Sequence, residues 1–169
     1  MAREHAVLSV LHRVFPKAPR AYLLCTDPEV MGAPFFVMER RRGTVVRETW
    51  PPSLPDDDDF RLRLAGNAVD TLAGLHRVDY RALGLEGLGR PEGFAARQVA
   101  GWVDRWNRAK HEEVPAMEEL GAWFPGAIPE PQAAVLLHND FKLDNLIVSD
   151  RGEVVAVLDW DMATQGAPL

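Results

Sequence analysis

The stretch LLHNDFKLDNLIV, residues 136–148, places a cluster of polar side chains between two apolar runs. The polar members of this cluster are His138, Asn139, Asp140, Lys142, Asp144 and Asn145. Because burying a polar or charged group without a partner costs roughly several kcal/mol, such a cluster beside buried strands usually persists for its chemistry. We therefore expect a functional site in this stretch.

The chain has 169 residues and a formal net charge of -6. This length fits one compact domain or two small lobes that share a cleft. Nucleic acids and anionic membranes are bound by basic surfaces, so the acidic balance argues against both as partners.

Cysteine content and hydropathy indicate the cellular setting. Cys25 is the only cysteine, so no internal disulfide can form and nothing requires an oxidising compartment. No run approaches the roughly 18 apolar residues that span a bilayer, and the N-terminal apolar stretch is too short for a signal peptide. We expect a cytoplasmic protein.

The first part of the chain predicts one helix and a small sheet. Apolar residues recur at helical spacing in residues 3–14, and Pro16 prevents the helix from continuing. Short apolar runs at residues 21–25 and 34–38, separated by turn residues, predict two strands. The segment WPPSLPDDDDF, residues 50–60, predicts an exposed connector, and its four aspartates fit a solvated helix start better than a metal cage.

The middle of the chain predicts three helices. Residues 60–78 carry an apolar stripe with a period of about 3.6 residues, which is typical of a long core-facing helix. Residues 94–110 repeat the pattern, and we interpret Trp102 and Trp106 as anchors in the core. A shorter helix is expected at residues 115–123.

The last part of the chain changes to the pattern of β-strands. Branched apolar runs at residues 134–137, 146–149 and 154–158 predict three strands. The residues between the last two runs predict a tight turn in which Asp150 faces Glu153.

This predicted hairpin brings oxygen ligands to one end of its ladder. Asn145 then lies opposite Leu158, and Asp159 follows at the same open end. The preceding loop adds Asp140, five residues before Asn145. Hard oxygen ligands suit Mg²⁺ that is shared with substrate phosphates, and the protein kinase pattern for phosphoryl transfer has this order of residues. Asp161 is a second-tier candidate ligand, because the direction of the chain after Asp159 is undetermined, and a structural role is favoured for it.

Two C-terminal segments carry a specific resemblance. HNDFKLDNLIV (138–148) and VLDWDMATQGAPL (157–169) resemble the catalytic and metal loops of the aminoglycoside phosphotransferase family. The resemblance continues upstream in REHAVLSVL (3–11), PFFVMERRRG (34–43), LAGLHRVD (72–79) and GRPEGFAARQVAGW (89–102). This combination is most similar to the branch of the family that is associated with acyl-CoA dehydrogenases.

The resemblance implies an α+β, protein-kinase-like fold with two lobes. Residues 1–50 would form a partial N-lobe of helix, strands and hinge. Residues 51–169 would form a partial, mainly helical C-lobe with the catalytic hairpin.

The resemblance also implies a role for individual residues, with ATP and Mg²⁺ as cofactors. Asp140 would be the catalytic base or hydroxyl-orienting group, and Asn145 and Asp159 would bind Mg²⁺. His138 would brace the catalytic loop. The nucleotide-binding residues would be Met38, Glu39 and Arg41 at the hinge, and Glu4, which normally pairs with a phosphate-binding lysine.

The chain departs from the family pattern at both ends. The family's lysine and Gly-rich strands lie before the first helix, but only Met1, Ala2 and Arg3 precede Glu4. The family also continues beyond Leu169 with helices that shape the acceptor site. We therefore expect a partial lobe at each end, impaired turnover, and helices whose uncovered faces favour oligomerisation.

The sequence leaves three functions open. The leading one is ATP-dependent transfer of a phosphoryl group to the hydroxyl of a small molecule. The second is a non-catalytic, kinase-like remnant that binds nucleotide weakly or acts as an interaction module. The third is metal-assisted hydrolysis of a phosphate ester, which leaves the hinge segment unexplained.

Overall fold

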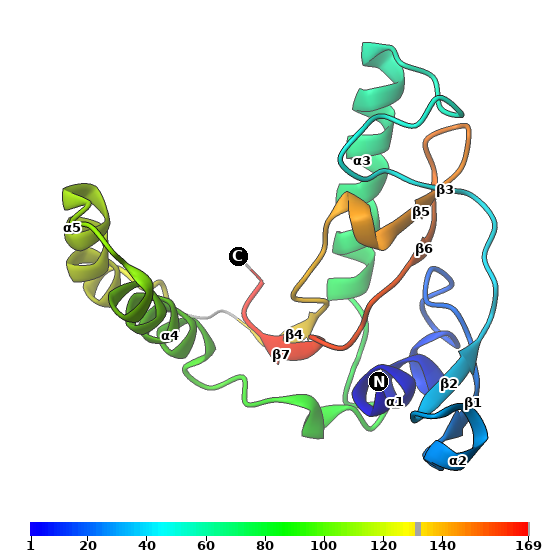
Figure 1. Ribbon diagram of the computed structural model, residues 1–169, viewed down its shortest axis with the longest axis horizontal. Helices are drawn as coiled ribbons and strands as arrows, with labels where there is room; N and C mark the ends of the chain where they lie inside the picture. The colour runs from blue at the N-terminus through cyan, green and yellow to red at the C-terminus, as the bar shows by residue number, and fades with distance from the viewer. Residues whose placement is uncertain (131–132, 169) are drawn as a thin grey trace.

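The computed structural model describes residues 1–130 and 133–168, which form helices and three small antiparallel sheets (Figure 1). The α-helices are α1 (Ala2–Leu11), α2 (Pro28–Met31), α3 (Asp58–His76), α4 (Phe94–Ala109) and α5 (Pro115–Trp123), and the 3₁₀ helices are η1 (Glu86–Leu88), η2 (Phe124–Gly126) and η3 (Leu143–Asn145). The strands are β1 (Ala21–Cys25), β2 (Phe35–Met38), β3 (Thr44–Val45), β4 (Val135–Leu137), β5 (Leu146–Val148), β6 (Val154–Val157) and β7 (Thr164–Gly166).

The first helix and the first sheet form as the sequence predicts, with small changes at their ends. α1 buries Val7, Leu8 and Leu11 and stops at Leu11, three residues earlier than predicted, because the chain turns ahead of Pro16. β1 and β2 pair antiparallel, as expected. The prediction missed α2, the single turn between them.

The predicted solvated helix start is confirmed at α3. The side chain of Asp57 accepts a hydrogen bond of 2.8 Å from the backbone N–H of Phe60, which is the geometry of an N-cap. Phe60, Leu64 and Leu75 are buried on one face of the helix. Figure 1 shows α3 running alongside the sheet that contains β5 and β6.

The predicted hairpin is present, but its register changes along the ladder. At the turn the N–H of Ser149 donates to the carbonyl of Glu153, so Asp150 does not face Glu153 as predicted. A bulge next to Val148 adds one residue to the second strand and restores the predicted register farther along. At the open end the N–H of Leu158 therefore donates to the carbonyl of Asn145 at 2.8 Å.

Two short strands were not predicted, and both pair with segments distant in sequence. β3 pairs antiparallel with β5, and β7 pairs antiparallel with β4. Runs of two or three residues carry too little periodicity to be seen in a sequence. The lobe boundary predicted between residues 50 and 51 stays a prediction. The ladder between β3 and β5 crosses this boundary, because β3 belongs to residues 1–50 and β5 to residues 51–169.

The prediction that Trp102 and Trp106 anchor the core is wrong. α4 has no buried residue, and the side chain of Trp102 is 65% exposed. Trp106 is half-buried and donates from its indole nitrogen to Glu118 of α5. α4 and α5 form an arm that extends away from the other helices (Figure 1), so most of the apolar stripe of α4 faces this arm rather than the core.

The core is centred on Trp160, whose side chain is fully buried. Its ring packs edge to face against the imidazole of His138, with centroids 4.7 Å apart, and against Phe15 at 6.2 Å. Its indole nitrogen donates to the carbonyl of Val157 at 2.8 Å, so this large side chain has no unsatisfied donor. Within residues 1–130 and 133–168, no helix combines the length and apolar character needed to cross a bilayer.

Removing the cap of α3 should destabilise the fold. We expect Asp57→Ala to lower the free energy of unfolding by about 1 kcal/mol, because the N–H of Phe60 loses its partner. Asp59→Ala removes only a first-turn charge and should cost less. Urea titration of both variants checks this, and equal losses would show that the cap hydrogen bond contributes nothing of its own.

The stability of the chain should fall at acidic pH through His138. Burial lowers the pKa of His138 below its ordinary value in the folded chain. The unfolded chain then binds the proton first, so this contribution is complete above about pH 6.5 and is lost as the pH falls. The slope is at most about 1.4 kcal/mol per pH unit for one such group.

Denaturant titrations at several pH values would measure this dependence. His138→Gln should give a shallower slope than the wild-type chain between about pH 7 and pH 5.5, since the titrating imidazole is gone. His111→Gln, at an exposed position, should keep the wild-type slope. Identical slopes for His138→Gln and the wild type would contradict the prediction.

Candidate active site

The catalytic loop predicted from the sequence leaves β4 and is held by His138. The imidazole is only 1% exposed, and its Nε2 bonds to the carbonyl of Leu158 at 2.9 Å. Its Nδ1 accepts from the N–H of Asp140 at 3.3 Å, which assigns the proton to Nε2. Burial lowers the pKa of His138, which favours the neutral ring, and the two hydrogen bonds select its tautomer.

Asp140 and Asn145 contact each other directly. The amide nitrogen of Asn145 donates to the carbonyl of Asp140 and to its carboxylate Oδ2, each at 2.9 Å. Both hydrogens of the amide are therefore used, and its Oδ1 is the atom left to meet another group. Asn145 is 8% exposed, so this orientation is fixed by packing as well as by the two bonds.

The hairpin ladder brings the backbone of Asp159 close to that of Asn145. The hydrogen bond from the N–H of Leu158 to the carbonyl of Asn145 is the last one of the hairpin, and Asp159 is the next residue after Leu158. Asp159 has a φ of 62° and Asn139 a φ of 66°, both in the left-handed region. Asn and Asp tolerate this region better than other residues with a Cβ, and such conformations gather at functional sites.

Glu4 reaches the same loop from α1. Its carboxylate accepts from the N–H of Trp160 at 3.3 Å, one residue beyond Asp159. Burial, together with the charges of Asp161 and Asp159, raises the pKa of Glu4. Arg3 supports this contact by donating to the carbonyl of Ala163 at 2.8 Å.

The predicted hinge residues form a separate group, on the strand β2 and just after it. Glu39 and Arg41 make an ion pair of 2.9 Å, and the N–H of Glu39 donates to the carbonyl of Arg20 at 2.8 Å. Arg41 also donates to the carbonyl of Pro16 at 3.1 Å. Met38 is 36% exposed at the end of β2.

Sequence reasoning gave no role to Lys142, although it lies in the polar stretch. Its ammonium is 3.1 Å from Oδ2 of Asp140. This contact, with the hydrogen bond from Asn145, lowers the pKa of Asp140. The signal in the sequence was the placement of a lysine two residues after the predicted base.

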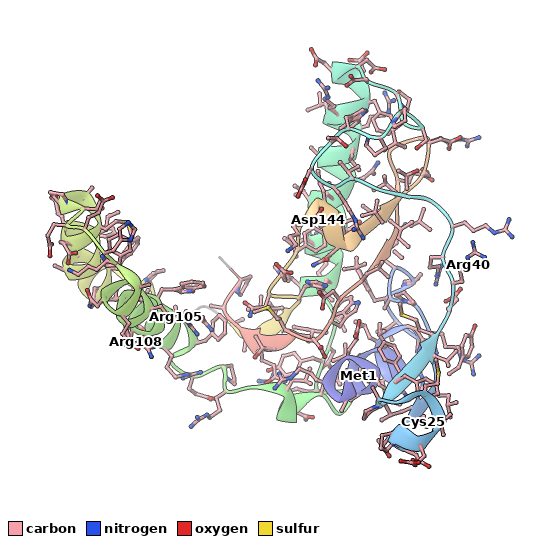
Figure 2. All side chains as sticks on the ribbon, viewed as in Figure 1. Met1, Cys25, Arg40, Arg105, Arg108 and Asp144 are labelled. Carbon is pink, nitrogen blue, oxygen red and sulfur yellow. The ribbon has the colours of Figure 1, made fainter. Side chains whose placement is uncertain are left out.

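A polar cavity of about 570 Å³ opens beside this lysine. Its lining residues come from the segment after β3 and from η3, and they are Arg47, Glu48, Thr49, Lys142, Asp144 and Asn145. Figure 2 shows Asp144 at η3, and it shows Arg105 and Arg108 on the distant α4. The sequence offered no sign that Arg47 would approach the catalytic loop, because that approach depends on the pairing of β3 with β5.

The donor set fits a metal that is shared with a substrate. In the described residues, no group of three or more His, Cys, Asp and Glu side chains could hold a metal ion. Asn145 and Asp159 offer one amide oxygen and one carboxylate, which suits Mg²⁺ because this ion takes one or two protein ligands and completes its shell with phosphates and water. The roles of these two residues and of Asp140 stay predictions.

Comparison with known proteins places the chain in a family. All of it, residues 1–169, matches the model of the phosphotransferase enzyme family. "Acyl-CoA dehydrogenase family member 11" of Gallus gallus is 37% identical over 169 residues, which are 99% of this chain and 21% of that protein. The chain thus spans about a fifth of the length of this curated relative.

Solved structures give the fold. The crystal structure of a candidate aminoglycoside phosphotransferase from Ralstonia eutropha is 34% identical with a TM-score of 0.86, and the match covers 98% of this chain and 51% of that one. A macrolide 2'-phosphotransferase from Brachybacterium faecium matches with a TM-score of 0.70 at 24% identity, over 99% of this chain and 55% of that one. The predicted α+β, protein-kinase-like fold is therefore confirmed over part of the length of these structures, and the chain belongs to the phosphotransferase enzyme family.

Proposed function

We propose that the chain carries the phosphoryl-transfer centre of an ATP-dependent phosphotransferase that acts on a hydroxyl group of a small molecule. The observation that carries this proposal is the contact between Asp140 and Asn145, beside which the hairpin sets Asp159. One carboxylate held by an amide, with a second carboxylate carried at the same end of the hairpin, is the arrangement that phosphoryl transfer needs. The family match supports the same reaction class.

In this reaction Asp140 receives the acceptor hydroxyl. Its Oδ2 is occupied by Asn145 and Lys142, which leaves Oδ1 for the hydroxyl proton. The hydroxyl oxygen forms a bond to the γ-phosphorus of ATP, and the bond from that phosphorus to the bridging oxygen breaks. ADP leaves with the electron pair, and the hydroxyl proton passes to Asp140.

Asn145 and Asp159 would hold Mg²⁺. When bound, this ion would neutralise charge on the β- and γ-phosphates. The Oδ1 of Asn145 is available for this role because its amide nitrogen is committed to Asp140. The left-handed backbone conformation of Asp159 determines the direction in which its side chain projects from the end of the hairpin.

The adenine would bind at the hinge. The N–H of Glu39 already donates to Arg20, so the groups proposed to meet the adenine edge are the carbonyl of Glu39 and the N–H of Arg41. Met38 precedes them at the end of β2 and would contact the ring. Glu4 would act from α1 by holding the backbone of the metal loop.

The acceptor is proposed to be a metabolic alcohol with an apolar part. A cavity of about 400 Å³ has Asn139, the neighbour of Asp140, among its lining residues. Much of the remaining lining is apolar and includes Trp102 of α4, Trp123 of α5 and Phe124 of η2. The name of the Gallus gallus relative, which refers to acyl-CoA dehydrogenases, favours metabolism over antibiotic modification.

The second candidate is a non-catalytic module that binds nucleotide or a protein partner. It is favoured by the exposed apolar surface of α4 and α5, where Trp102 is 65% exposed and Trp123 is 60% exposed. Nucleotide binding without turnover would select this function. Turnover of phosphate esters without ATP would select metal-assisted hydrolysis.

Binding of ATP should depend on Asp159. In calorimetric titrations with Mg²⁺ present, we expect Asp159→Asn to weaken ATP binding by at least about tenfold, as loss of a metal ligand should. Asparagine tolerates the left-handed φ of this position, so the fold should be kept. Asp104→Asn, on the exposed face of α4, should bind ATP like the wild type. Unchanged binding in Asp159→Asn would remove Asp159 from the metal site.

Turnover should depend on Asp140 while binding does not. Asp140→Asn should slow transfer to a screened panel of alcohols by about 10²- to 10⁴-fold, because the acceptor loses its base. The dissociation constant for ATP should change little. Asp150→Asn, in the exposed hairpin turn, is the matched control and should keep the wild-type rate. A rate in Asp140→Asn equal to that of the control would refute the proposed role.

A further inference from the structure

The cavity of about 400 Å³ beside the catalytic loop has two polar side chains in an otherwise apolar lining. They belong to Gln98 of α4 and to Asn139, the residue before Asp140. Among the described residues that line this cavity, none is charged. Sites for small molecules typically have this composition, because apolar walls bind the body of the ligand and a few polar groups fix its orientation.

Both carboxamides are available to a ligand. The side chains of Gln98 and Asn139 are exposed, and neither makes a hydrogen bond to another group within residues 1–130 and 133–168. The amide of Asn145, in contrast, spends both of its hydrogens on Asp140. A free carboxamide offers two donor hydrogens and an acceptor oxygen, so it can bind a hydroxyl or a carbonyl group.

The backbone holds Asn139 in place at the edge of this cavity. Asn139 has a φ of 66°, and the residues on either side of it are joined by the hydrogen bond of 3.3 Å from the N–H of Asp140 to Nδ1 of His138. The imidazole of His138 is itself buried. The position of Asn139 relative to the proposed base is therefore fixed by the turn.

The start of α4 is fixed against the same part of the molecule. A Cβ atom at Gly166 of β7 would lie 2.6 Å from a ring carbon of Phe94 and 2.8 Å from Leu137, so only a glycine lets the ring approach this closely. Phe94 is the first residue of α4, and Gln98 follows it by about one turn of the helix. Gln98 is thus held at the part of the arm that is anchored on β7.

We infer that Asn139 and Gln98 are specificity-determining residues for the acceptor, and that the acceptor carries a second hydrogen-bonding group beside the hydroxyl that is phosphorylated. This inference rests on the proposed function. The reacting hydroxyl meets Asp140, so the adjacent carboxamide of Asn139 binds the group on the neighbouring carbon, and Gln98 binds the same group from the arm. The apolar remainder of the acceptor lies against Trp102 and Trp123.

The experiment measures the binding of octane-1,2-diol and octan-2-ol, which differ only in the second hydroxyl. Binding to the full chain is followed by the fluorescence of Trp102 and Trp123, whose exposed side chains line the cavity. Asn139→Gly removes one carboxamide and tolerates the left-handed backbone, and Gln98→Leu removes the other. Asn107→Leu, at an exposed position of α4 outside the cavity lining, is the matched control. Thermal unfolding of each variant checks that it is folded.

The wild-type chain should bind the diol about three- to tenfold more tightly than octan-2-ol, which is the net effect of about one hydrogen bond. Asn139→Gly and Gln98→Leu should each reduce this preference without weakening the binding of octan-2-ol, and Asn107→Leu should keep it. Residues with a merely structural role would weaken both probes alike. The inference is overturned by equal affinities of the wild type for the two probes, by an unchanged preference in both variants, by equal losses for both probes, or by no binding of either probe.

The proposed function is decided by a separate result, the binding of ATP and its dependence on Asp159. ATP binding that depends on Asp159, together with no preference for the diol, would overturn this inference alone. Failure of the folded wild-type chain to bind ATP would overturn the proposed function, and this inference with it.

Discussion

A neutral, buried imidazole holds the candidate site together. His138 uses one ring nitrogen to accept from Asp140 and the other to reach the carbonyl of Leu158, so a single side chain sets the spacing of the catalytic loop and the metal loop. Only one tautomer makes both bonds, and burial against Trp160 favours the uncharged ring. A protonated imidazole would present a second N–H to the N–H of Asp140 and would lose that bond. The hydrogen bonds that hold the two loops at this spacing therefore depend on the protonation state of His138.

The first helix is the second support of the metal loop. Glu4 accepts from the N–H of Trp160, and Arg3 donates to the carbonyls of Leu88 and Ala163. These bonds connect the first turn of α1 to the segment that follows Asp159. Because α1 also buries Leu8 and neighbouring apolar residues in the core, its position and that of the metal loop are coupled. This coupling gives Glu4 a structural role that requires no lysine partner.

Buried apolar residues are distributed unevenly along the chain. α1, α3 and the hairpin of β5 and β6 supply the buried core, whereas α4 and α5 have no buried residue. The apolar stripe of α4 was a sound sign of a helix, but most of it faces α5, η2 and solvent rather than the core. Amphipathic periodicity reports that a face is apolar and does not report which surface covers it. The exposed tryptophans of this arm are consequently the part of the chain that is best suited to contact other molecules.

The sequence by itself determined the main helices, the first sheet and the C-terminal hairpin, and their order along the chain. Helical periodicity identified α3 and α4 closely. The spacing of Asp140, Asn145 and Asp159 predicted that they would gather at one end of the hairpin, because a strand ladder converts sequence distance into position. Tertiary structure decided what no local pattern encodes: the pairing of β3 with β5 that brings Arg47 to the catalytic loop, the bulge that corrects the hairpin register, and the burial of Trp160 against His138. Tertiary structure also decided the hydrogen-bond and ion-pair partners of Glu4 and Lys142, because a long charged side chain can reach several polar groups. The fold determines which of these groups is the actual partner, because it fixes which backbone and side-chain groups lie close to each charged side chain.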